Sequence, residues 1–366
     1  MEAKKLPILN VPRAELLTWL EPFGSPRMRC RQIERWLLIG RAETFEQMSD
    51  LPRRLREELA ARFEPLGTRI DRHLTASDQT HKLLLRLPDD HLIECVLIQD
   101  ADRRTACIST QVGCGMGCVF CASGLNGVVR NLTSGEILEQ LLRLRNLLAP
   151  DQRLTHIVVM GMGEPLANLD NLLTALEIAG SKDGLDIGAR HITISTVGLP
   201  AKIRRLAELG KQYHLAVSLH APNDALRSQI VPTNDKTGLP DILAAADYFF
   251  ERTGRQVTFE YVLLHDVNDR AAQARELARL LQGRQAHVNL IPFNDVEGLS
   301  YRRPSQETLV QFTDVLRRAG ISVKVRKRKG SEIDAACGQL RRKVEREQTV
   351  ATVGAGDENR LGLPLV

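Results

Sequence analysis

The chain has 366 residues, of which 43% are hydrophobic and 26% charged, and its formal net charge of +5 comes from 50 Lys and Arg against 45 Asp and Glu. This length allows one large or two ordinary domains, and the composition is that of a globular protein, which excludes wholesale disorder. No stretch reaches the roughly 18 apolar residues of a membrane span and residues 1–20 contain no apolar signal-peptide core, so we expect a cytoplasmic protein with no membrane partner.

Residues 1 to about 85 are predicted to form an N-terminal helical accessory domain. Amphipathic helical patterns run through residues 29–38 and 51–63. The segment is rich in arginine, with one group at Arg27, Arg29, Arg31 and Arg35 and a second at Arg53, Arg54 and Arg56. Such arginines form either a solvated helix face or a surface that binds phosphate groups of a nucleic acid, and composition alone leaves both interpretations open.

From His81 the hydrophobic pattern changes to that of strands. Residues 82–87 and 92–99 are expected to form a hairpin that turns at Pro88, Asp89 and Asp90 and ends the accessory region near residue 100. From this pattern alone, Glu94 in the second strand would be a surface carboxylate on an edge strand.

Strands and helices then alternate along most of the chain. The expected strands are 105–110, 156–160, 191–196, 214–219, 257–264, 288–292 and 322–326. The expected helices are 133–148, which opens on a Thr133/Glu136 capping box, 168–179, 200–209, 240–252, 270–281 and 305–319. Six or seven such units in a row predict an α/β fold with a parallel sheet, either an open or closed barrel or, as the alternative, a doubly wound sheet. Residues 341–366 are expected to form a loose tail.

A loop after the first of these strands contains Cys114, Cys118 and Cys121, together with Gly115 and Gly117. Thiolates bind soft metals and iron-sulfur clusters, and the glycines allow the tight turns that such a short loop needs. A structural zinc site takes four protein ligands, and an electron-carrying [4Fe-4S] cluster normally has a thiolate on each iron. Three thiolates leave one iron open, so the loop predicts a cluster that binds a small molecule and reacts with it.

Polar and glycine residues follow several of the predicted strands. Ligands bind at the carboxyl ends of the strands in parallel α/β folds, so these loops are candidate binding positions. Gly161 and Gly163 permit close approach of the backbone, and Glu164 offers a carboxylate for an ammonium group. Later strand ends carry Ser195, Thr196, Ser218, Leu219, His220 and Asn294. Each residue alone is typical of an ordinary turn, but the repetition favours a ligand pocket.

Five segments taken together resemble the RlmN/Cfr family of radical SAM RNA methyltransferases. They are residues 111–121, 130–133, 161–165, 218–223 and 334–340. The resemblance covers nearly the whole chain to just past Cys337. It implies a partial (β/α)6, TIM-like radical SAM barrel over residues 101–340.

The resemblance also implies roles for individual residues. Cys114, Cys118 and Cys121 would hold a [4Fe-4S] cluster whose open iron chelates S-adenosylmethionine (SAM). The positions that match the family's SAM-contacting residues are Gly163, Glu164, Ser195, Ser218, Leu219, His220 and Asn294. The residues that match the family's catalytic positions are Cys337 as the methyl carrier, Cys107 as its partner and Glu94 as the proton acceptor. By composition alone, Cys107 and Cys337 would be small buried hydrophobic residues.

The implied reaction uses two SAM molecules per turnover. One methylates Cys337, and the other yields a 5'-deoxyadenosyl radical that removes a hydrogen from the S-methyl group. The methylene radical adds to an adenine carbon, Glu94 takes the ring proton, and a disulfide between Cys107 and Cys337 releases the product. Residues 111–114 are more similar to the RlmN branch, which favours adenine C2 over C8.

The implied substrate is an adenine of 23S rRNA at the peptidyl-transferase centre, with tRNA as a further substrate. We expect a monomer that takes electrons from a flavodoxin or ferredoxin. A second basic run, Lys324 and residues 326–329, leads toward Cys337 and is either a solvated face or a surface for the RNA backbone. Two other classes remain open: a radical SAM activase or maturation enzyme, and an RNA-binding ribosome-assembly factor with a structural cluster.

Overall fold

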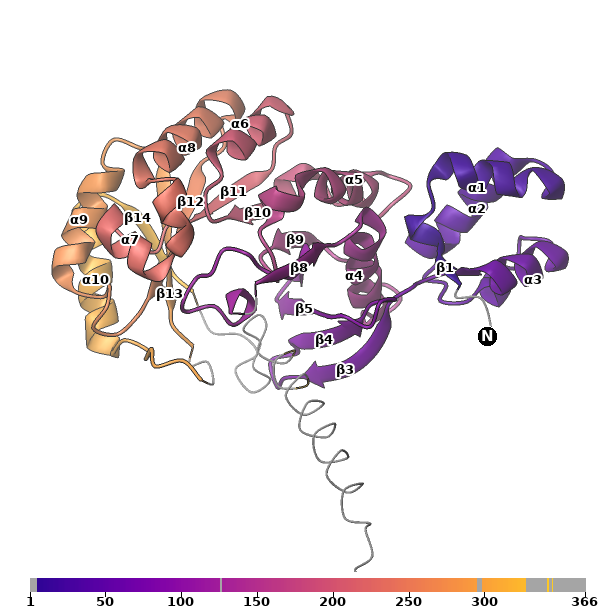
Figure 1. The fold of residues 1–366 in the computed structure, drawn as a ribbon, viewed down its shortest axis with the longest axis horizontal. Helices are drawn as coiled ribbons and strands as arrows, with labels where there is room; N and C mark the ends of the chain where they lie inside the picture. Colours follow the sequence, from indigo (N-terminus) through magenta and orange to yellow (C-terminus); the bar gives the residue numbers. More distant parts are fainter. Residues whose placement is uncertain (1–4, 126, 295–297, 327–340, 342–343, 345–366) are drawn as a thin grey trace, which may run out of the picture.

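The computed structural model describes residues 5–125, 127–294, 298–326, 341 and 344. Figure 1 shows a group of N-terminal helices beside a strongly curved sheet whose outer face is covered by helices. In the described ranges, no helix has both the length and the apolar character needed to cross a lipid bilayer.

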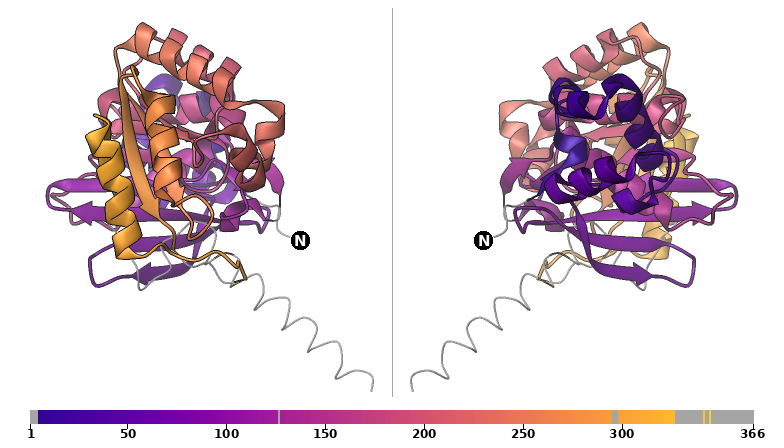
Figure 2. Two further views of the ribbon diagram at one scale, coloured as in Figure 1. Left: turned by 90° about the vertical axis from the view of Figure 1, so that its left-hand side faces the viewer. Right: turned by 90° about the vertical axis from the view of Figure 1, so that its right-hand side faces the viewer.

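The N-terminal helices are α1 (Arg13–Leu20), α2 (Pro26–Leu38) and α3 (Arg53–Arg62). They enclose a small apolar core of their own, closed by a short parallel pair between β1 (Leu6–Pro7) and β2 (Phe63–Glu64). Figure 2 shows this group from its own side, against the sheet and its helices.

The expected helical pattern up to residue 85 is wrong beyond α3, because β3 (Arg69–Thr75) is a strand. Most side chains of β3 are exposed on both faces, so the strand shows no apolar alternation in the sequence. The predicted hairpin is confirmed as β4 (His81–Arg86) and β5 (Leu92–Asp100), and β3 pairs antiparallel with β4. β5 also pairs with β6 (Arg103–Cys107), so the hairpin belongs to the main sheet.

The main sheet has ten strands in the order β14-β13-β12-β11-β10-β9-β6-β5-β4-β3, and those from β6 to β14 run parallel. The remaining parallel strands are β9 (His156–Val159), β10 (Ile192–Thr196), β11 (His214–Ser218), β12 (Val257–Leu263), β13 (Ala286–Pro292) and β14 (Ser322–Val325). Helices α4 (Ser134–Asn146), α5 (Leu169–Gly180), α6 (Pro200–Glu208), α7 (Asp224–Ile230), α8 (Leu239–Thr253), α9 (Ala271–Leu281) and α10 (Gln306–Arg318) lie between them.

The strand order follows the sequence order without reversal, which confirms the partial barrel and excludes a doubly wound sheet. The capping box at Thr133 and Glu136 opens α4 as predicted. The sequence pattern missed α7, because seven residues are too few to show a helical period.

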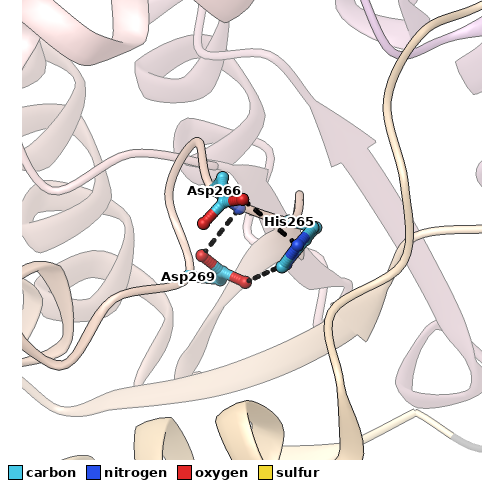
Figure 3. A group of neighbouring side chains, drawn as sticks. All are labelled: His265, Asp266 and Asp269. Atoms are coloured by element: carbon cyan, nitrogen blue, oxygen red, sulfur yellow. Dashed lines mark hydrogen bonds and ion pairs between the residues drawn. The ribbon is translucent and has the colours of Figure 1, made fainter.

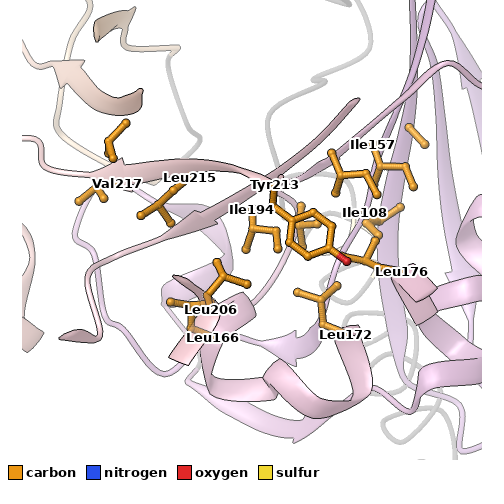
Figure 4. Packing of buried hydrophobic residues seen from close by; sticks show 14 of the residues in the cluster. Ile108, Ile157, Leu166, Leu172, Leu176, Ile194, Leu206, Tyr213, Leu215 and Val217 are labelled. Atoms are coloured by element: carbon orange, nitrogen blue, oxygen red, sulfur yellow. The ribbon is translucent and has the colours of Figure 1, made fainter. Parts of the chain in front are cut away.

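The main core lies between the strands and the outer helices. Figure 4 shows Ile157, Ile194 and Leu215 of neighbouring strands meeting Leu172 and Leu206 of the helices. Alternate residues along β10, such as Ser195, point to the opposite, inner face of the sheet. The fold therefore presents polar strand residues to the barrel interior and apolar ones to the helices.

Candidate functional site

The cysteine loop lies between β7 (Gln111–Gly113) and β8 (Val128–Asn131), which pair as a small hairpin. Gly113 has a φ of 80°, and a Cβ atom there would lie 2.1 Å from the carbonyl oxygen of Gly127. The backbone N–H of Cys114 donates to that same oxygen at 2.8 Å. Only glycine fits at this close approach, which fixes the start of the cysteine loop.

The other end of the loop packs against the carboxyl ends of the parallel strands. The N–H of Val119 donates to the Ile230 carbonyl at 3.1 Å, and the Phe120 ring meets the His220 ring edge-on at 4.9 Å. Ala122 belongs to an apolar cluster with Val197 and other residues that follow the strands. The structure thus brings the cysteine loop to the strand ends that the sequence marked as candidate binding positions.

The three thiols of the loop lie close enough to interact electrostatically. Burial raises the pKa of Cys114 to about 12, and burial followed by the charges of the other two cysteines raises the pKa of Cys118 further. A thiolate needs a compensating cation in such a place, and metal coordination supplies one.

The spacing of the thiols bears on the kind of metal group that fits. Sulfur ligands of a single tetrahedral zinc lie about 3.8 Å apart. Among the described residues, one group of three potential ligands has all its ligand atoms within 4.8 Å of one another, and that group is His265, Asp266 and Asp269, not the three cysteines. The three thiols therefore do not all lie within 4.8 Å of one another, and a donor set of three cysteine sulfurs fits a [4Fe-4S] cluster.

The segment after β9 lies directly against the residues that precede the cysteines. A Cβ atom on Gly163, whose φ is 104°, would lie 2.7 Å from the backbone nitrogen of Gln111. The N–H of Glu164 donates to the Gln111 side chain at 2.9 Å. Gly163 thus permits a close backbone approach, here between two segments of the chain itself.

The Glu164 carboxylate is buried and joins two strand ends. It accepts from the N–H of Leu166 at 3.0 Å and from the N–H of Val197, after β10, at 2.7 Å. Burial raises its pKa, and these two hydrogen bonds oppose that shift. The side chain therefore already has two backbone partners.

His220 follows β11 and is buried and neutral. Burial, and then the charge of Arg227, lower its pKa to about 3. Its Nδ1 accepts from the N–H of Val262 at 3.1 Å, so the ring proton is on Nε2. Its φ of 61° is held by Asn268, whose side-chain amide donates to the His220 carbonyl at 2.8 Å.

The other predicted positions lie on the same rim of the barrel. Ser195 is half-buried on the inner face of β10, and Ser218 is half-buried at the end of β11. Leu219, which follows, is fully buried. Asn294 follows β13, where its side-chain oxygen accepts from Arg303 at 3.2 Å. The sequence-predicted binding residues thus lie at or just after the carboxyl ends of β9, β10, β11 and β13, the end of the sheet against which the cysteine loop packs.

Glu94 is not a surface carboxylate, contrary to the expectation from its pattern. It is 2% exposed, and its Oε2 lies 2.9 Å from Nζ of Lys82, which is 0% exposed. Its Oε1 accepts from the backbone N–H of Arg341 at 2.6 Å. The error arose because β5 is an interior strand and because Arg341 and Val344 lie over the inner face of the hairpin.

Cys107 lies on the same face of the sheet as Glu94. It pairs in register with Val96 of β5, two residues beyond Glu94, and is buried. Side chains alternate along a strand, so Glu94, Val96 and their neighbour Cys107 share the inner face. Cys337 lies outside the described residues, and no disulfide joins any two of the cysteines that the structure describes.

A second group of potential ligands lies beyond β12. His265, Asp266 and Asp269 place their ligand atoms within 4.8 Å of one another (Figure 3). His265 lies 3.2 Å from Asp266 and 3.5 Å from Asp269, and Asp269 also accepts from the N–H of Asp266. These close contacts and the hydrogen bond between the two aspartates account for the arrangement.

Sequence reasoning missed three residues that support the site. They are Lys82, Arg227 and Asn268. Each lies next to a residue that was singled out, but a lone lysine, arginine or asparagine gives no signal of burial in a single sequence.

Comparison with known families matches both parts of the chain. Residues 108–280 match the radical SAM superfamily, and residues 6–64 match the ribosomal RNA large subunit methyltransferase N-terminal domain. The first match contains the cysteine loop and most of the barrel, and the second contains helices α1 to α3.

Individual proteins match over nearly the full length. A probable dual-specificity RNA methyltransferase RlmN from Rhodopirellula baltica is 54% identical over 93% of this chain and 91% of its own length. The protein of the same description from Alkaliphilus oremlandii is 45% identical over 93% of this chain and 98% of its own. The crystal structure of a radical SAM methyltransferase from Sphaerobacter thermophilus superposes with a TM-score of 0.87, at 44% identity, and covers 91% of this chain and 98% of that one.

Proposed function

Because the chain belongs to the RlmN family of radical SAM RNA methyltransferases, we propose that it methylates C2 of an adenine in 23S rRNA, at the peptidyl-transferase centre, and of an adenine in tRNA. The observation that carries this proposal is the agreement over 93% of the chain with relatives described as dual-specificity RNA methyltransferases. A radical SAM maturation enzyme would have no need for the N-terminal domain that matches residues 6–64.

The substrate explains why such chemistry is required. SAM normally gives its methyl group to a nucleophile, but C2 of adenine is electron-poor and has no lone pair to offer. A [4Fe-4S] cluster held by Cys114, Cys118 and Cys121 would supply the electron that cleaves SAM reductively. The electron would come from a flavodoxin or ferredoxin in the cytoplasm.

The SAM-binding residues of the proposal surround that cluster. The positions we assign are Gly163, Glu164, Ser195, Ser218, Leu219, His220 and Asn294. The two backbone hydrogen bonds that the Glu164 carboxylate accepts fix its position, and because each carboxylate oxygen can accept more than one hydrogen bond, we assign it to the ammonium group of SAM. His220 is neutral and has its proton on Nε2, which makes it a hydrogen-bond donor rather than a cation.

Three further residues carry the covalent part of the reaction. The thiolate of Cys337 takes the methyl group of a first SAM, and a second SAM serves as the radical source. After the methylene carbon bonds to C2, Glu94 would accept the ring proton, and the unpaired electron left on the base would return to the oxidised cluster. The thiolate of Cys107 would then attack the sulfur of Cys337, so that an S–S bond forms as the C–S bond breaks, and the electron pair left on the methylene carbon would take up a proton to give the methyl group. The position of Glu94 and Cys107 on one inner face supports this division of roles.

The RNA would contact the N-terminal helices and the end of β14. Arg27, Arg31 and Arg35 of α2 are exposed, as are Arg53 and Arg54 of α3, which suits contacts to phosphate groups. We expect the protein to act as a monomer.

Nucleoside mass spectrometry of RNA from a deletion strain tests the proposal. We expect 2-methyladenosine to be lost from 23S rRNA and tRNA and to return with the intact gene but not with a gene for Cys337→Ala. Loss of 8-methyladenosine would favour a Cfr-like C8 reaction instead, and unchanged nucleosides would contradict an RNA methyltransferase.

Mass spectrometry of the whole protein tests the methyl carrier separately. The protein isolated from cells with ample SAM should carry one additional methyl group on Cys337. The Cys107→Ala variant should accumulate a covalent adduct with RNA on a denaturing gel, because its release step is blocked.

A further inference from the structure

Arg227 of α7 is one of the largest side chains that the fold buries completely, at 1% exposure. Its guanidinium donates to the carbonyl of Val197 at 2.5 Å, of Ser218 at 3.1 Å and of Leu219 at 3.0 Å, and to the side-chain oxygen of Asn234 at 2.7 Å. One side chain thus ties together the loops after β10 and β11.

The positive charge of Arg227 has no ionic partner of the usual kind. All four of these acceptors are neutral oxygens, and no carboxylate in the described part of the chain forms a salt bridge with it. Burying a charge without a counter-charge costs several kcal/mol, on the order of the effective penalty for one ion in a protein interior. A buried arginine in this position therefore calls for a nearby negative group.

The cysteine loop lies against the same part of the fold as Arg227, because Cys118 packs on the apolar cluster that contains Val197, whose carbonyl accepts from Arg227, and Ile230 of the same helix. Burial lowers the pKa of Arg227 to about 10, and the charge that opposes this shift most is that of Cys118, followed by Asp224. The effect is mutual, since Arg227 lowers the pKa of Cys118. The fold holds the cysteine loop beside α7 through the hydrogen bond from the N–H of Val119 to the carbonyl of Ile230.

We infer that Arg227 is a positioning residue that serves as the buried counter-charge of the cluster thiolates and eases reduction of the cluster, while it fixes the carbonyls of the SAM-binding loops. This inference rests on the proposed function for the assignment of Cys118 as a cluster ligand. Reduction adds negative charge to a cluster that three thiolates already make anionic. A fixed positive charge beside it favours the reduced state and raises the reduction potential.

The test is the midpoint potential of the reconstituted cluster, measured by redox titration with electron paramagnetic resonance and without RNA. Arg227→Gln, which keeps a hydrogen-bond donor but loses the charge, should shift the midpoint to more negative values. Arg227→Lys, which keeps the charge but loses the planar fork, should stay near the wild-type midpoint and bind SAM several-fold more weakly.

Arg145 of α4 provides the matched control. It is also buried, burial also lowers its pKa to about 10, and it also donates to backbone carbonyls, those of Leu37 and Leu38 in the N-terminal domain. Arg145→Gln should destabilise the fold and leave the midpoint unchanged. An equal midpoint in wild type and Arg227→Gln, or an equal shift in Arg145→Gln, would overturn the inference.

A further variant covers the case in which Arg227→Gln does not fold. Asn234→Asp would place a carboxylate at the position that now accepts from Arg227 at 2.7 Å, and should also shift the midpoint to more negative values. An unshifted midpoint in that variant would also overturn the inference. The iron and sulfide content of the wild-type protein tests the proposed function separately. A wild-type protein that binds no cluster would contradict the proposed function, whereas a wild-type protein with a cluster and an unshifted midpoint in the variants would contradict only the role of Arg227.

Discussion

The buried ion pair between Lys82 and Glu94 permits a quantitative prediction. Both side chains are at most 2% exposed, and their charged atoms lie 2.9 Å apart. At an effective dielectric constant of about 20, this distance gives ~6 kcal/mol of attraction, most of which offsets the desolvation of the two charges. Lys82→Met leaves the Glu94 carboxylate buried without its partner, which costs about 3–5 kcal/mol in the free energy of unfolding.

Urea denaturation followed by circular dichroism measures this loss. The double variant Lys82→Met/Glu94→Gln should recover most of it, because a neutral glutamine leaves no uncompensated charge and still accepts from the N–H of Arg341. The control is Arg53→Met, which breaks the ion pair between Arg53 and Glu57. The charged atoms of that pair lie 2.8 Å apart, but its side chains are 86% and 61% exposed, so the free energy of unfolding should not change measurably. A loss below about 1 kcal/mol in Lys82→Met, or no recovery in the double variant, would refute the reasoning.

Three further predictions concern the site. The stability that neutral His220 confers is fully present above its unfolded pKa of about 6.5 and is lost as the pH falls toward its folded pKa of about 3. Between pH 7 and 5, the free energy of unfolding of His220→Asn should therefore fall by about 2 kcal/mol less than that of the wild type. Equal decreases in the two proteins, measured by urea titration at both pH values, would contradict this. Gly163→Ala should lower the melting temperature and weaken SAM binding in calorimetry, because its Cβ would lie 2.7 Å from Gln111, whereas Gly188→Ala, with nothing within 4 Å, should do neither. Cys118→Ala should abolish RNA methylation and the iron-sulfur absorption band, and methylated RNA from this variant would be incompatible with a radical mechanism.

The alternating part of the fold was predictable, except for the seven-residue α7, because the other helices and the strands there have a regular apolar period. The capping box at Thr133 and the barrel strands followed from local patterns alone. The strand β3 was not predictable, since most of its side chains are exposed and its sequence shows no apolar alternation. Patterns report which face of an element is apolar, and the pattern of β3 marks no such face.

Some residues of the candidate site were also predictable from the sequence, and others were not. The cysteine loop and the strand-end residues were found because their spacing and their positions after strands carry chemical meaning. The burial of Glu94 was not predicted from the sequence, because this burial depends on Arg341, which is distant in sequence and covers the inner face of the hairpin. Arg227 and Lys82 likewise owe their environment to contacts between segments, which no local pattern reports.

The most direct test of the proposed reaction uses SAM with a deuterated methyl group and purified protein, with analysis of the methylated adenine by mass spectrometry. Under multiple turnovers, the radical route removes one deuterium from the methyl group on Cys337 before the carbon bonds to the base. The account predicts 2-methyladenosine with two deuterium atoms in its methyl group. A product that keeps all three deuterium atoms would contradict it, because intact transfer of the methyl group requires a polar displacement.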